Sequence, residues 1–89
     1  MNTEHRIINA NAKRLDAIDD ESVALIVTSP PYPMIEMWDQ VFSEQSPEVS
    51  QYLEEGRGND AFEAMHQVLD QVWDECDHVL IPNGFVCIN

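Results

Sequence analysis

Two short apolar segments on either side of a long amphipathic segment limit the folds open to this chain. Val23–Val27 and Phe85–Ile88 are apolar and partly β-branched, as strands covered on both faces are. Between them, apolar residues recur at helical spacing and predict a helix over Asp60–Leu80. Its apolar stripe consists of Phe62, Met65, Leu69, Val72, Trp73, Cys76 and Leu80. A strand, a helix and a strand in this order predict a parallel pair joined by a crossover, so the predicted fold class is α/β.

Weaker elements are predicted elsewhere in the chain. They are a strand at Arg6–Asn9, one or two helical turns at Ala12–Ile18, a polar turn at Asp19–Ser22, a short helix within Met34–Phe42, and a polar loop at Ser43–Asn59 with a helical turn near Val49–Glu54. Asp60 and Glu63 have the spacing of a capping box at the start of the long helix. Pro82-Asn83-Gly84 is expected to stop that helix and turn the chain.

The number of predicted strands is small for such a sheet. Two strands and one weak strand are few for a sheet that is covered on both faces. We therefore expect these 89 residues to be the amino-terminal portion of a longer protein. A compact three-stranded domain is the alternative.

The charge of the chain is strongly negative. Seventeen acidic residues oppose only four basic ones, Arg6, Lys13, Arg14 and Arg57, which gives a net charge of −13. Proteins that bind DNA gain most of their affinity from cations placed on phosphates. These residues alone are therefore expected to bind nucleic acid poorly, and double-stranded DNA would be bound through basic regions that they do not include.

Composition also bears on the setting of the protein. No apolar run is long enough to cross a membrane. The two cysteines, Cys76 and Cys87, form no disulfide framework and are expected to be small buried hydrophobic residues, which favours a reducing, cytoplasmic location. Cys76 and His78 lie on different sides of a helix, so a metal site is not expected.

The loop Ser29–Tyr32 follows the first strand directly and carries the chemistry. Prolines lack a backbone N–H, so Pro30 and Pro31 leave a rigid loop that offers carbonyl oxygens, a hydroxyl and an aromatic ring. Ligands of open α/β sheets bind at the carboxyl ends of strands, where this loop lies. Such a loop suits a flat ligand that donates hydrogen bonds, such as a nucleobase with an exocyclic amine.

The loop could activate that amine. Acceptors at the Ser29 hydroxyl and the Pro30 carbonyl would localise the lone pair of the amine nitrogen and stabilise positive charge that grows there in the transition state. Tyr32 could stack on the ring face. A base held in this way must first be flipped out of the duplex.

At these residues the chain resembles the amino-group DNA methyltransferases, whose catalytic motif is usually written Asp/Asn/Ser-Pro-Pro-Tyr/Phe. The long helix, the Pro-Asn-Gly turn and the last strand resemble the elements that follow the motif in that family. The resemblance implies a partial Rossmann-like sheet and direct methyl transfer from S-adenosyl-L-methionine, without a covalent enzyme intermediate. Serine at the first motif position is similar to the cytosine-N4 branch, and the adenine-N6 branch is the alternative.

The resemblance also implies roles for individual residues. Ser29, Pro30, Pro31 and Tyr32 would be catalytic, with Tyr32 and Trp38 against the substrate base. Asn11 and Thr28 are candidates for cofactor binding, although Ala10-Asn11 stands where relatives often carry Gly-Asp. Met34 and Met37 are expected to be core residues.

The order of motifs resembles the permuted type, in which the cofactor segment comes later in the chain. Gly56-Arg57-Gly58 is a weak match to a cofactor loop because it follows a polar stretch rather than a strand. Residues 1–89 would thus be the catalytic-motif part of the domain, without cofactor and target-recognition parts and inactive alone. The implied enzyme belongs to a restriction–modification system, with a restriction endonuclease of the same site as partner. A small acidic protein that imitates DNA is the competing interpretation, favoured by the net charge.

Overall fold

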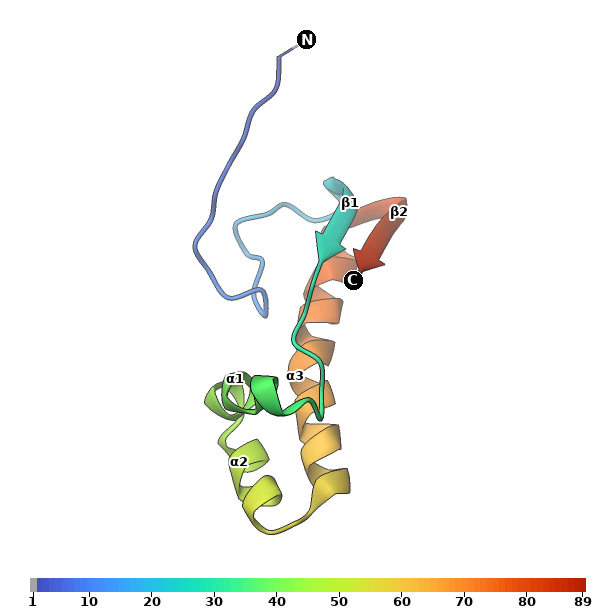
Figure 1. The fold of residues 1–89 in the computed structure, drawn as a ribbon. Coiled ribbons are helices and arrows are strands. Elements are labelled where there is room, and N and C mark those ends of the chain that lie inside the picture. The colour runs from blue at the N-terminus through green and yellow to red at the C-terminus, as the bar shows by residue number, and fades with distance from the viewer. Residues whose placement is uncertain (1) are drawn as a thin grey trace.

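The long helix α3 (Gly58–Val79) is the spine of the protein (Figure 1). In the computed structural model, which describes residues 2–89, the molecule is elongated, with extents of 55 × 24 × 22 Å. Two short helices pack beside the first half of α3, and two strands lie at its carboxyl end. The other elements are β1 (Val23–Thr28), the 3-10 helix η1 (Glu36–Trp38), α1 (Asp39–Gln45), α2 (Pro47–Glu54) and β2 (Leu80–Ile88).

The two strands pair in parallel, which confirms the predicted crossover. Leu25 is opposite Phe85, and the register continues to Thr28 opposite Ile88. Arg6–Asn9 forms no strand, so that prediction is wrong. Ala12–Ile18 forms isolated turns rather than a helix, because a segment of this length does not offset the cost of helix nucleation without a packing surface.

A bulge interrupts β2 where a turn was predicted. Two steps along β1, from Val23 to Leu25, correspond to five steps along β2. The Pro82-Asn83-Gly84 segment lies in this irregular stretch, and α3 has already ended at Val79. A Cβ at Gly84 would lie 3.0 Å from the Ile81 carbonyl oxygen, so only glycine fits this position. The prediction that this segment stops the helix is wrong, since it bends the strand instead.

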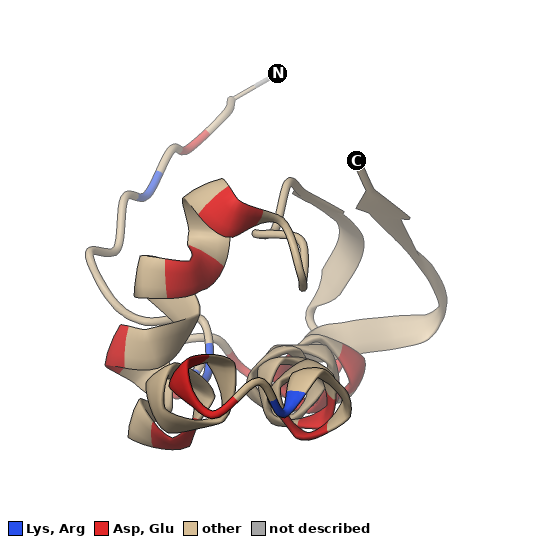
Figure 2. Cartoon of the chain, turned by 60° about the horizontal axis from the view of Figure 1, so that its bottom comes forward, with Lys and Arg blue, Asp and Glu red and all other residues tan. Residues whose placement is uncertain are grey.

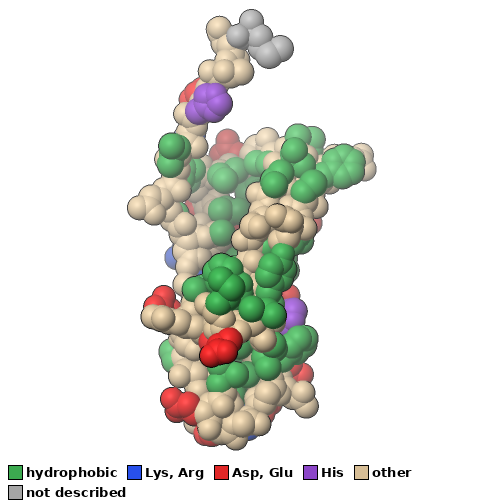
Figure 3. Space-filling model, viewed as in Figure 1, with side chains coloured by type: hydrophobic (Ala, Val, Ile, Leu, Met, Phe, Trp, Pro, Cys, Tyr) green, Lys and Arg blue, Asp and Glu red, His purple; other side chains and the backbone are tan. Residues whose placement is uncertain are grey.

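One face of the sheet is partly covered by α3 and the other is open. Val86 and Ile88 face α3, where they line a small hollow with Trp73 and Cys76. On the opposite face, Val27 and Phe85 are each 71% exposed. Hydrophobic side chains are visible on the surface at the end of the molecule that holds the strands (Figure 3). The expectation that both strands are covered on both faces is therefore wrong for residues 2–89.

The two cysteines differ in exposure because they lie on different surfaces. Cys76 lies on the buried stripe of α3, as predicted, and burial raises the pKa of its thiol. Cys87 lies opposite Val27 on the open face of the sheet and is exposed, so the prediction that it is buried is wrong.

The largest core lies between the helices rather than under the sheet. Its buried members come from α1, α2 and α3 and are Phe42, Val49, Ala64, Met65, Val68 and Leu69. Four partly buried residues pack against them, namely Trp38, Tyr52, Leu53 and Trp73. The predicted stripe of the long helix is confirmed for Met65 and Leu69, whereas Phe62 is about half exposed. The core therefore fixes α3 at its amino-terminal half.

Helices α1 and α2 occupy most of the segment predicted to be a polar loop. Each is anchored by a single fully buried side chain, Phe42 in α1 and Val49 in α2. Pro47 stands in the first turn of α2, where its fixed φ suits a helix and its missing N–H costs nothing. The helical turn predicted near Val49–Glu54 is confirmed as part of α2, and the short helix predicted within Met34–Phe42 is found as η1 and the start of α1. The prediction made both helical segments too short because most of their other residues are polar.

The Gly56-Arg57-Gly58 segment connects α2 to α3. The Arg57 N–H donates to the Tyr52 carbonyl at 2.8 Å, and the Gly56 N–H donates to the Leu53 carbonyl at 3.2 Å. With Gly56 at a φ of 71°, these bonds form a Schellman motif that ends α2. The two glycines therefore belong to a helix connection and not to a cofactor loop.

The predicted capping box at Asp60 is wrong. Helix α3 begins at Gly58, with Arg57 as its N-cap residue. The Asp60 carboxylate accepts hydrogen bonds from the Arg57 guanidinium at 2.8 Å, so it ties the helix start to the preceding turn.

No helix among residues 2–89 combines the length and apolarity that a membrane span requires.

Candidate active site

The Ser29–Tyr32 loop leaves β1 at the carboxyl edge of the sheet, as predicted (Figure 1). The Asn89 N–H donates to the Thr28 carbonyl at 2.9 Å, which continues the pairing of the two strands to this edge. The Tyr32 hydroxyl donates to the Asn89 carbonyl oxygen, so the ring is tied to the end of β2. The two strand ends and the loop therefore form one continuous rim.

The motif side chains are accessible from solvent. Ser29 is exposed, Pro30 and Pro31 are half-buried, and Tyr32 is 48% exposed. Within residues 2–89, the Ser29 hydroxyl makes no side-chain hydrogen bond, so it is free to accept one from a ligand. The Ser29 side chain is not turned into packed interior, and the Tyr32 ring retains exposed surface for stacking.

A strained turn follows the motif. The Ile35 N–H donates to the Tyr32 carbonyl at 3.4 Å, with Pro33 and Met34 between them. Met34 has a φ of 64°, and the Met34 N–H donates to Sδ of Met65 at 3.3 Å. Proline followed by a positive φ is the pattern of a type II turn. The chain therefore turns sharply after Tyr32 and comes to rest against α3.

The residues after this turn lie differently from their prediction. Met34 is 45% exposed and Met37 is 72% exposed, so the expectation that they are core residues is wrong. Trp38 is half-buried and packs against the helical core. Met34 nevertheless touches α3, through its N–H to Met65 and through its side chain near Gly58.

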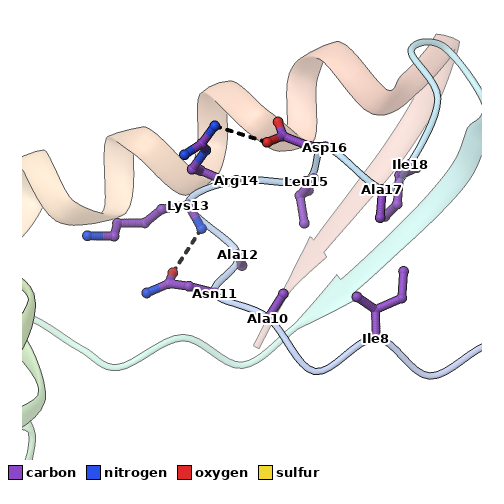
Figure 4. A pocket seen from close by; sticks show the side chains of 10 residues that line it. All are labelled: Ile8, Ala10, Asn11, Ala12, Lys13, Arg14, Leu15, Asp16, Ala17 and Ile18. Carbon is purple, nitrogen blue, oxygen red and sulfur yellow. Dashed lines mark hydrogen bonds and ion pairs between the residues drawn. The ribbon is translucent and has the colours of Figure 1, made fainter.

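Asn11 lies in a different part of the molecule from the motif. The Asn11 amide donates to Gln45 Oε1 at 3.0 Å and its Oδ1 accepts from the Lys13 N–H at 3.0 Å, so both ends of the amide are engaged. Asn11 lines an open hollow of about 730 Å³ (Figure 4). The other lining residues are Ile8, Ala10, Ala12, Lys13, Arg14, Leu15, Asp16, Ala17 and Ile18.

This hollow does not form a complete site for S-adenosylmethionine. Its wall is largely apolar and suits a purine face, and Arg14 is paired with Asp16 at 3.2 Å. The lining does not include Thr28 or the Ser29–Tyr32 loop, so a ligand there shares no wall with the Ser29 hydroxyl or the Pro30 carbonyl. Residues 2–89 thus do not bring the candidate cofactor residues and the motif into one cavity.

Across residues 2–89, no cluster of histidine, cysteine and carboxylate side chains is arranged to hold a metal ion.

A histidine flanked by two carboxylates fastens the segment before β1 to the end of α3. His78 Nδ1 lies 2.6 Å from Asp20 Oδ1, and His78 Nε2 lies 2.9 Å from Glu75 Oε2. The same Glu75 oxygen accepts the Leu15 N–H at 2.7 Å. We call His78, Asp20 and Glu75 the histidine clamp. Sequence reasoning missed it because Asp20 and His78 are 58 residues apart and carry no shared pattern.

The clamp shifts the pKa values of its members. The hydrogen bond to Glu75, followed by the one to Asp20, raises the pKa of His78 above its ordinary value of 6.5. The Leu15 N–H, followed by His78, lowers the pKa of Glu75 below its ordinary value of 4.5. Both shifts favour the charged pair.

We expect the clamp to make stability depend on pH. The contribution of His78 is fully present below pH 6.5 and is lost as pH rises through its raised pKa, while that of Glu75 is present above pH 4.5 and is lost as pH falls through its lowered pKa. The melting temperature of the wild type should therefore exceed that of His78→Gln most between about pH 4.5 and 6.5. Thermal unfolding of both proteins across pH 4 to 9 checks this, and parallel curves would contradict it.

Comparison with known proteins identifies two similar sequences. The chain is 44% identical over 90 residues to the Type II methyltransferase M.MthZI of Methanothermobacter thermautotrophicus, and 43% identical over 100 residues to the Type II methyltransferase M.MjaI of Methanocaldococcus jannaschii. The match covers the whole chain but only 25% and 33% of these relatives. No family model matches the chain, and no solved structure matches it significantly.

Proposed function

We propose that the chain is the catalytic-motif part of a Type II DNA methyltransferase of a restriction–modification system. The observation that carries the proposal is the accessible Ser29–Tyr32 loop at the carboxyl edge of a parallel sheet. The similarity along the whole chain to two proteins named Type II methyltransferases supports it. The complete protein would have a Rossmann-like methyltransferase sheet, of which β1, α3 and β2 form one part.

The proposed reaction is methyl transfer to the exocyclic N4 amine of cytosine in duplex DNA. The Ser29 hydroxyl oxygen and the Pro30 carbonyl would accept the two amine N–H groups and orient the nitrogen lone pair. Both oxygens stabilise the positive charge that this nitrogen acquires, which is an interaction stronger in the transition state than before it. The Tyr32 ring would stack on the extruded base.

The methyl donor would be S-adenosyl-L-methionine, held mainly by parts of the protein beyond these residues. Thr28 stands next to the motif but is half-buried and bound to Asn89 through its carbonyl. Asn11 holds a turn and reaches Gln45. We propose them as marginal contributors to the cofactor site, and we expect the 89-residue chain to be inactive by itself.

DNA would be held by basic regions outside this chain. Acidic residues are spread over the helices (Figure 2), and the guanidinium of Arg57 is already engaged by Glu55 and Asp60. Arg14 is paired with Asp16. The cytoplasmic location and a cognate restriction endonuclease acting at the same site belong to the same proposal.

Analysis of the methylated product tests the proposal. The full-length protein, incubated with duplex DNA and labelled S-adenosylmethionine, is expected to yield N4-methylcytosine after the DNA is digested to nucleosides. N6-methyladenine in its place would support the adenine alternative, which one motif residue does not exclude. If neither product forms while the chain displaces DNA from a basic protein, the acidic DNA-mimic interpretation, favoured by the net charge of −13, would replace this proposal.

A further inference from the structure

Met34 occupies a position that normally requires glycine. In a type II turn, the residue after proline has a positive φ, and glycine or asparagine is usual there. Met34 adopts a φ of 64° with a full side chain. The chain uses glycine in the same region of φ at Gly56, where an added Cβ would meet nothing within 4 Å. A strained methionine at the turn therefore needs an explanation.

The contacts of Met34 provide one. The Met34 N–H donates to Sδ of Met65, a fully buried core residue of α3. The Met34 Cε lies 3.9 Å from the place of a Cβ on Gly58, so the side chain extends to the first turn of α3. The turn thus joins the loop to the helix through both the backbone and the side chain of Met34.

The loop is consequently held at two places. Within it, the Tyr32 hydroxyl is bound to the Asn89 carbonyl at the end of β2, and after it Met34 is bound to α3. Between these places lies the Tyr32 carbonyl, which accepts the Ile35 N–H. Loss of the Met34 contact would leave Tyr32 with a single attachment to the rest of the protein at the sheet.

We propose that Met34 is a positioning residue for the amine-binding loop, and that its strained turn and its contact with Met65 fix the place of the Tyr32 ring. This inference rests on the proposed function. Backbone strain that persists at a site is maintained by its surroundings and often serves preorganisation. Glycine at this place would keep the N–H that bonds Met65 but would lose the side chain that reaches the first turn of α3, so the strained methionine docks the turn more firmly.

The substitution Met34→Gly separates positioning from stability. Glycine relieves the strain of the positive φ, so the melting temperature of the full-length protein should not fall by more than about 3 °C. The turnover number for methyl transfer should fall roughly tenfold to a hundredfold, because displacement of a reacting group by about 1 Å has effects of this size. The KM for DNA should change less than about threefold, because the same groups still bind the base.

The matched control is Glu21→Gly. Glu21 has a φ of 49° and lies in the exposed turn before β1, away from the loop. It therefore undergoes the same backbone change without touching Met65 or Tyr32, and methyl transfer should stay at the wild-type rate. A second variant, Met65→Leu, keeps the buried volume but removes the sulfur acceptor, and it should lower turnover in the same direction.

Amide hydrogen exchange gives a readout that does not depend on activity. In Met34→Gly, the Ile35 N–H should exchange faster than in the wild type, because the turn that contains its bond to the Tyr32 carbonyl loses the side-chain contact that docks it on α3. Wild-type turnover in Met34→Gly, or unchanged Ile35 exchange, would overturn the inference. If the wild type transfers no methyl group, the proposed function fails, and the exchange measurement still decides whether Met34 holds the loop.

Discussion

Tyr32→Ala is expected to lower kcat/KM for methyl transfer by the full-length protein roughly tenfold to a hundredfold. Stacking of a base on an aromatic side chain contributes about 1–3 kcal/mol, which corresponds to a factor of this order. The substitution also removes the hydroxyl bond that ties the loop to the Asn89 carbonyl. Pro30→Ala should reduce methyl transfer as well, because alanine frees the backbone φ that orients the accepting carbonyl. Affinity for S-adenosylmethionine should change little in either variant.

Tritiated methyl incorporation into DNA, measured beside cofactor affinity, checks this prediction. Tyr32→Phe is the matched control, since it keeps the ring but not the hydroxyl, and it should retain more activity than Tyr32→Ala. Wild-type turnover in both Tyr32→Ala and Pro30→Ala would remove the roles assigned to the loop. Parallel loss of cofactor affinity would show that the loop acts on the cofactor rather than on the base.

Phe42→Ala is expected to destabilise the protein by about 3–5 kcal/mol, the usual cost of removing a buried phenylalanine side chain. Phe42 is 1% exposed and is the buried residue that anchors α1 to the helical core. Small domains have total stabilities of about 5–15 kcal/mol, so this loss would remove a large part of the free energy of unfolding. Denaturant titration followed by circular dichroism measures the change in the free energy of unfolding.

The same substitution at an exposed site is the control. Phe85 is 71% exposed on the open face of the sheet, so Phe85→Ala in the 89-residue chain should cost less than about 1 kcal/mol. Equal losses for Phe42→Ala and Phe85→Ala would contradict the helical location of the core. A larger loss for Phe85→Ala in the full-length protein than in the 89-residue chain would show that further sequence covers that face.

In the elements that were predicted correctly, the apolar residues follow a clear local pattern in the sequence. Val23–Val27 and the long helix are apolar at the spacing of a strand and of a helix, so their types follow from the sequence, and their order then determines the parallel pairing. Helices α1 and α2 were predicted only in part, as a short helix within Met34–Phe42 and a helical turn near Val49–Glu54, because each has one fully buried residue among polar neighbours. Their stability comes from packing on α3, which local pattern does not reveal.

The candidate site also contains one feature that the sequence predicts and others that depend on tertiary contacts. The place of the Ser29–Tyr32 loop could be predicted because two consecutive prolines directly after an apolar run favour the end of the strand, whereas the single Pro82 is accommodated at a bulge of β2. The positive φ of Met34 and its bond to Met65 could not, since methionine carries no turn signal and the two residues are 31 apart. The histidine clamp depends on tertiary contacts of the same kind.

The length of α3 has a mechanical consequence for the loop. A helix of 22 residues is about 33 Å long, so a tilt of about 5° about its midpoint moves each end by roughly 1.5 Å. The helical core packs against one half of this helix, and the sheet that carries the Ser29–Tyr32 loop lies at the other end. The segment from β1 to Met34 runs beside α3 (Figure 1) and is attached to it again at Met34, through the bond to Met65. This second attachment to α3 limits how far the loop oxygens, which we propose to bind the amine, move relative to the helical core.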